Sequence, residues 1–170
     1  MEYLEYRKIG RVFVIRFDEG DDVIKILEDF SRKKKILAGV LTFLGALKKP
    51  RLVVGSRTVK GLNKPWWAQG VSNDGYEVLG FGTIFPIIER AEKFSKPSVH
   101  IHIASGRKNS ATLVGCLRGI GDVHITIECV IYELVPSRRQ ADRRTRQQKI
   151  RGFVRSRRSD GVALLTPKSH

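Results

Sequence analysis

Cysteine and long apolar segments are scarce in this chain of 170 residues. The two cysteines, Cys116 and Cys129, form no CxxC pair and no disulfide framework, so a reducing compartment is expected. No apolar run approaches the roughly 20 residues needed to cross a bilayer. Residues 1–5 are acidic and polar, unlike a secretory signal. We therefore expect a cytoplasmic protein without a membrane segment.

Sequence motifs of common enzyme classes are also missing. The chain has no Walker loop, no GxGxxG after a strand-like segment and no Gly-x-Ser-x-Gly nucleophile elbow. The short glycine pairs at 80–82 and 119–121 are better explained as a strand kink and a hairpin turn. No general base stands beside the histidines discussed below. These absences favour a binding protein over an enzyme.

Positive charge is abundant, and most of its excess lies at one end. The formal net charge is +15, with 32 Lys+Arg against 17 Asp+Glu. Residues 1–136 contain 21 basic and 15 acidic residues, whereas residues 137–170 contain 11 and 2. We predict one folded domain, residues 1–136, followed by a flexible, Arg-rich tail, residues 137–170. Such a tail suits DNA or RNA, although it is also consistent with a solvated appendage.

Arginine dominates the tail, and its contacts with phosphate would be mostly independent of base sequence. The string Lys149-Ile150-Arg151-Gly152-Phe153 lacks the Arg-Gly-Arg-Pro core of an AT-hook, which excludes that minor-groove motif. The predicted phosphate-binding residues are Arg138, Arg139, Arg143, Arg144, Arg146, Arg151, Arg155, Arg157 and Arg158.

The first third of the chain predicts a strand, a helix and a second strand. Residues 11–17 are rich in β-branched and aromatic side chains, which favours a strand. Asp21 or Asp22 can cap a helix that ends near Lys35, and its apolar residues recur at helical spacing: Val23, Ile26, Leu27 and Phe30. The apolar run 36–44 predicts a buried strand, with 51–54 paired back on it.

The later segments predict mostly strands. Glycine, asparagine and proline indicate a long loop over 55–75, in which Trp66 and Trp67 are either apolar anchors or surfaces for bases or subunits. Strands are expected at 76–84, 98–104, 112–117 and 124–134, with a helical turn near 87–94 and an edge strand at 161–165. This order predicts an α/β fold of the α+β type with an antiparallel sheet.

His100 and His102 form the most specific local pattern. On a strand they share one face and lie about 6–7 Å apart at their Cα atoms. Cys116, on the following strand, supplies a third ligand for zinc, and the fourth position stays open. His124 and Glu128 are further candidates, the latter in the second coordination sphere. The alternative is a pair of half-buried histidines hydrogen-bonded on a sheet face.

Taken in order, these segments resemble the PPC (plants and prokaryotes conserved) domain, from about Arg11 to Leu134. The opening strand and helix match, and the segment from Gly39 to Leu47 is similar to the family's G-x-x-x-x-x-G-A-L stretch. Residues 76–84 are similar to its E-hydrophobic-x-x-x-x-G-x-I segment, 97–102 to its P-H-x-H strand, and 128–134 to its closing strand. Residues 113–117 stand where many members carry G-G-H-L.

The resemblance implies a mostly antiparallel sheet of about seven strands flanked by one or two helices, assembled as a trimer. It also implies DNA binding and, in prokaryotic members, a metal site of three histidines. Here His100 and His102 match that set, whereas Cys116 stands in the third position. We predict a trimeric DNA-binding protein that is not an enzyme. The alternatives are a trimeric metal- or small-molecule-binding protein with a His/His/Cys site, or a zinc-dependent hydrolase.

Overall fold

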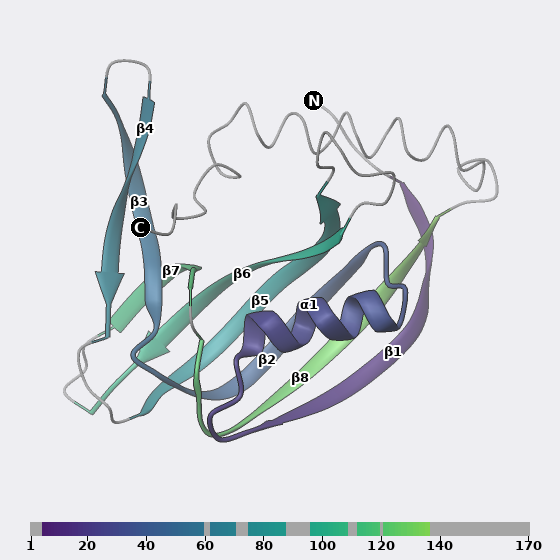
Figure 1. The fold of residues 1–170 in the computed structure, drawn as a ribbon, viewed down its shortest axis with the longest axis horizontal. Helices are drawn as coiled ribbons and strands as arrows, with labels where there is room; N and C mark the ends of the chain where they lie inside the picture. Colours follow the sequence, from purple (N-terminus) through teal and green to yellow (C-terminus); the bar gives the residue numbers. More distant parts are fainter. Residues whose placement is uncertain are drawn as a thin grey trace.

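In the computed structural model, one antiparallel sheet with a helix on one face accounts for the described residues, which are 5–59, 62–70, 75–87, 96–108, 112–119 and 121–136 (Figure 1). Their elements in chain order are β1 (Tyr6–Asp18), α1 (Val23–Lys33), β2 (Gly39–Lys48), β3 (Arg51–Val59), β4 (Leu62–Gln69), β5 (Gly75–Ile87), β6 (Lys96–Gly106), β7 (Thr112–Leu117) and β8 (Val123–Pro136). The fold class predicted from the sequence is confirmed, with eight strands in place of about seven.

The helix begins and ends as its sequence predicts. Asp22 is the N-cap, and its carboxylate accepts a hydrogen bond from the backbone N–H of Lys25. Arg32 and Lys33 lie in the last turn, where positive charge is favourable. Val23 and Leu27 are fully buried, and Ile26 and Phe30 pack against the same core. The predicted apolar face of α1 is confirmed.

The strands lie in the order β1-β8-β2-β5-β6-β7-β3-β4, and all neighbours are antiparallel. The last strand therefore separates β1 from β2, which splits the expected β-α-β unit. The predicted pairing of residues 51–54 with the preceding strand is wrong, because β2 pairs with β5 and β8 while β3 pairs with β4 and β7. The short turn at Pro50 between two strand-like segments suggested a hairpin that the sheet does not form.

The predicted loop over 55–75 is also wrong, because β3 and β4 occupy most of it as a hairpin. Its turn-forming residues fit an edge hairpin: Pro65 lies on the edge strand β4, and Gly55 lies opposite Trp66. The other predicted strands among the described residues are confirmed: β7 has the predicted bounds, β2 begins and ends three to four residues later than predicted, and the remaining strands are longer than predicted. The predicted turn at 87–94 overlaps β5 at Ile87, and its remaining residues lie outside the described part of the chain.

Neither glycine pair has its predicted role. Gly80 and Gly82 continue a regular ladder rather than a kink. A Cβ at Gly80 would collide with the ring of Phe43, and one at Gly82 would lie 2.8 Å from the carbonyl oxygen of His100. Gly119 has a positive φ of 82°, but β7 and β8 pair with different neighbours, so no hairpin forms there.

The core lies between α1 and the inner face of the sheet. Alternate residues of each strand point inward, such as Val99, Ile101 and Ile103 of β6, and are nearly or fully buried. Those between them point to the opposite, outer face. No helix in the described part of the chain has the length and apolar character needed to cross a membrane. Residues 137–170, including the predicted strand at 161–165, lie outside the described residues.

Candidate metal centre

His100 and His102 occupy alternate positions of β6 and project from the outer face of the sheet. Cys116 lies on the neighbouring strand β7, directly opposite His102 in the register. The predicted arrangement of these three residues is therefore present: two histidines on one face of a strand and the cysteine beside them.

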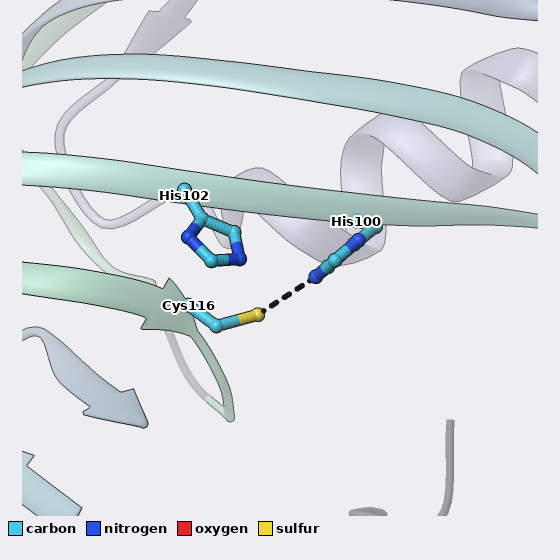
Figure 2. Close-up of side chains that lie close together, drawn as sticks. All are labelled: His100, His102 and Cys116. Carbon is cyan, nitrogen blue, oxygen red and sulfur yellow. Dashed lines mark hydrogen bonds between the residues drawn. The ribbon is translucent and has the colours of Figure 1, made fainter. Parts of the chain in front are cut away.

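The three side chains converge in Figure 2. His100 Nε2 lies 3.1 Å from Cys116 Sγ, and the centroids of the two imidazole rings are 5.0 Å apart. The ring planes meet at 77°, so the two rings do not stack face to face. One ligand atom from each residue lies within 4.8 Å of the other two.

These distances fit a tetrahedral metal after small side-chain adjustments. Zinc–nitrogen bonds of about 2.0–2.1 Å and zinc–sulfur bonds of about 2.3 Å place ligand atoms roughly 3.3–3.6 Å apart. Ligand atoms as much as 4.8 Å apart would therefore need to approach each other by at most about 1.5 Å. Two imidazoles and a thiolate are a donor set suited to zinc, and three protein ligands leave one coordination position open.

Burial and a nearby cation set the protonation of the ligands. Partial desolvation of its imidazole, followed by the positive charge of Arg118, lowers the pKa of His102, which favours the neutral ring that binds metals. Burial raises the pKa of the Cys116 thiol, and Arg118 opposes that shift only in part. Without a metal the thiol therefore keeps its proton, which metal binding must displace. Sequence reasoning missed Arg118, which follows Cys116 by two residues.

The centre lies within a row of residues that crosses five strands. Phe81 is opposite His102 on one side, and Cys116 is followed by Val53 and then Trp67 on the other. Residues paired in this way share a face, so the row lies on the outer face. The side chain of Phe81 is 62% exposed. The candidate ligands are thus surrounded by apolar and aromatic side chains.

Thr83 adds a polar group to these surroundings. It pairs with His100 in the register, and its buried hydroxyl has no hydrogen-bond partner among the described residues. A hydroxyl of this kind can bind a water or a ligand carried by the metal. Sequence reasoning missed Thr83, because its place beside His100 depends on the register between β5 and β6, which neither segment shows alone.

The other two candidates are not part of the centre. His124 and Glu128 lie on β8, which β2 and β5 separate from β6. His124 Nδ1 instead lies 4.0 Å from Glu19. Within the described ranges, the group of metal-ligating side chains consists of His100, His102 and Cys116.

Trp66 and Trp67 are exposed strand residues rather than buried side chains that fasten a loop to the sheet. Both lie on β4, with 54% of Trp66 and 39% of Trp67 exposed. The guanidinium of Arg51 stands 4.3 Å from the ring centroid of Trp67. The interpretation of both as apolar anchors is therefore wrong. The nine predicted phosphate-binding arginines lie outside the described residues.

Comparison with known proteins agrees with the resemblance seen in the sequence. Residues 4–135 match the model of the Plants and Prokaryotes Conserved (PCC) domain, the family described above as PPC. No curated protein matches the chain significantly.

Solved structures share the fold at low sequence identity. A plant- and prokaryote-conserved protein of Pyrococcus horikoshii is 22% identical with a TM-score of 0.61, and the alignment covers 81% of this chain and 87% of that one. A metal-containing protein of Archaeoglobus fulgidus is 21% identical with a TM-score of 0.62, covering 81% and 88%. A Bacteroides thetaiotaomicron protein named a "putative DNA binding protein" is 21% identical with a TM-score of 0.58, covering 76% and 82%.

Proposed function

The chain belongs to the Plants and Prokaryotes Conserved (PCC) domain family, and on that premise we propose that it is a DNA-binding protein rather than an enzyme. It would act as a homotrimer whose basic C-terminal segments contact the phosphate backbone. This function implies that the protein is located in the nucleoid.

The distribution of charge carries this proposal. Residues 137–170 hold 11 basic residues against 2 acidic ones, and nine of the basic residues are the arginines named above. Each phosphate neutralised by a cation releases condensed counterions, so binding should be strong at low salt and should weaken steeply as salt rises. Three such segments in one trimer would bind together, which raises the apparent affinity without any new kind of contact.

The outer face of the sheet supports self-association. Large apolar side chains stand exposed there on different strands: Val14 is 79%, Leu79 68% and Val114 59% exposed. Large apolar side chains exposed on several strands of one sheet face are the kind of surface that subunit contacts commonly cover. A further copy of the chain packed on this face would cover these side chains. Such packing is compatible with the trimer that the family resemblance implies.

The His/His/Cys group favours a second candidate function, a trimeric metal- or small-molecule-binding protein. His100, His102 and Cys116 would hold the metal, which we propose to be Zn²⁺, and Thr83 would lie beside it. When bound, zinc would supply a Lewis acid with an open position. A zinc-dependent hydrolase is the less favoured form of this candidate, because it would also need a general base.

Fluorescence anisotropy with a labelled DNA duplex tests the main proposal on the full chain. We expect binding at low ionic strength, with log K falling by about 0.9 for each phosphate contact per tenfold increase in salt. A variant with the nine tail arginines changed to glutamine should lose most of the affinity. The matched variant with lysine at the same positions should retain it, because charge is kept. Binding that is absent at low salt, or unchanged by half-molar salt, would refute the proposal.

A further inference from the structure

The β3–β4 hairpin extends beyond the rest of the sheet as a two-stranded ribbon. Leu52 and Val53 of β3 pair with β7, and the carbonyl of Arg51 accepts a hydrogen bond from the backbone N–H of Arg118, whereas β3 from Gly55 onward pairs with β4 alone. Figure 1 shows these two strands rising away from the helix and the other strands. Two-stranded ribbons are marginally stable in water. A ribbon that contributes so little to the core suggests a surface used for contact.

All charged residues of the hairpin are basic. Residues 51–69 contain Arg51, Arg57, Lys60 and Lys64 and no Asp or Glu. Arg57 stands directly opposite Lys64 in the register. Like charges opposite each other destabilise a strand pair. An anion bound across the two strands would offset that repulsion, so the hairpin is complementary to a polyanion.

Trp66 lies on the same face of the ribbon as this cation pair. Gly55 is opposite Trp66, and each stands two residues from a member of the Arg57–Lys64 pair, so all four share one face. A Cβ at Gly55 would lie 3.1 Å from Trp66 Cε3, which shows that the indole lies close against the glycine backbone. More than half of the Trp66 side chain nevertheless remains exposed, at 54%.

We propose that the face formed by Trp66, Arg57 and Lys64 is a binding site for single-stranded DNA. An unpaired base stacks on the Trp66 indole, and the two cations contact the neighbouring phosphates. A duplex keeps its bases stacked on each other, so the exposed ring selects single strands. This inference rests on the proposed DNA-binding function and adds to it a surface on the folded domain, separate from the tail. A contact between two such hairpins is disfavoured because both are cationic.

Intrinsic fluorescence tests the stacking directly, since the chain has two tryptophans. In the full chain with Trp67→Phe, Trp66 is the sole indole. Titration with an oligothymidylate of about 12 nucleotides, within the usual site size of about 4–16, should quench its emission. The reciprocal Trp66→Phe chain reports Trp67, which stacks with Arg51 on the other face, and should show little change.

Affinity measured by anisotropy gives a second readout. Trp66→Ala should weaken binding of the oligothymidylate by roughly 5- to 150-fold, the range found for loss of one base–aromatic stack, and Trp66→Phe should retain most of it. Arg57→Gln combined with Lys64→Gln should reduce the slope of log K against log salt by about 1.4, or about 0.7 per phosphate on a single strand. The control is Lys25→Gln with Lys33→Gln, which removes the same charge from exposed positions of α1.

The outcomes separate this inference from the function on which it rests. If the full chain binds DNA while Trp66 emission is unchanged and the Arg57/Lys64 variant equals its control, the hairpin site is refuted and the tail proposal stands. If the full chain binds no DNA, both fall. If Trp66→Ala instead changes the oligomeric mass, the hairpin is a subunit contact and the inference is wrong.

Discussion

Removing one candidate ligand by His102→Ala should abolish stabilisation of the protein by zinc. A ligand present at 100 times its dissociation constant stabilises the folded state by about 2.7 kcal/mol. For a chain of 150–250 residues, each kcal/mol shifts Tm by about 2–4 °C. Zinc should therefore raise the Tm of metal-free protein by about 5–11 °C. His102 is the best position to change because its side chain is exposed and Cys116 is only 6% exposed.

Differential scanning fluorimetry on the full chain, with and without zinc, measures this shift. His124→Gln is the matched control, since it removes a histidine that lies outside the ligand group. Its own Tm can change, but the increase caused by zinc should match that of the wild type. A wild-type Tm that zinc leaves unchanged, or a His102→Ala response equal to that of the wild type, would contradict the proposed metal centre.

Proton release gives the same prediction a second test. Because burial raises the pKa of Cys116, the thiol is protonated at neutral pH and must lose its proton when it binds a metal. Zinc affinity should consequently rise with pH. In weakly buffered solution at neutral pH, the wild type should release about one proton per zinc bound, and Cys116→Ala should release none from this source.

Three further predictions concern the fold and its surfaces. Gly80→Ala should destabilise the protein by about 1–3 kcal/mol in chemical denaturation, because the new methyl group meets the buried ring of Phe43, and adding Phe43→Leu should recover part of the loss. Burial raises the pKa of Glu28, so the folded state binds this proton more tightly than the unfolded state, and stability should fall as pH rises from about 4.3 through the raised pKa. Glu28→Gln keeps the acceptor for the Val99 N–H and should remove this loss of stability with rising pH. The variant should be as stable as the wild type at low pH and more stable than the wild type at pH 8. Phe81→Asp should reduce the mass seen in mass photometry to that of a monomer without loss of secondary structure, and an unchanged mass would exclude this face as the subunit contact.

The sequence was sufficient for those parts of the fold that depend on local periodicity. Helix α1 has a capping aspartate, an apolar stripe and terminal cations, so its bounds followed closely from the residues. Strand pairing was less accessible because it depends on distant residues. Nothing local indicates that β8, at the far end of the domain, lies between β1 and β2.

The candidate centre was likewise predictable from the sequence only where local alternation decides which side chains share a face. Alternation along one strand was enough to place His100 and His102 on a common face, and the next strand brought Cys116 beside them. Thr83 and Phe81 come from β5, whose register against β6 cannot be read from either segment alone. The hairpin was missed because its glycines and Pro65 are typical of loops, whereas an edge ribbon tolerates them.

The adjacent tryptophans show why the two proposed sites are separable. In a loop, Trp66 and Trp67 would form one apolar unit, but in a strand consecutive side chains point to opposite faces. Trp67 continues the row that contains Val53, Cys116 and His102, whereas Trp66 lies with the cation pair. A substitution at Trp66 should therefore alter contact with DNA without changing the response to zinc. Removal of His102 should do the reverse, because the β3–β4 backbone stands between the two faces.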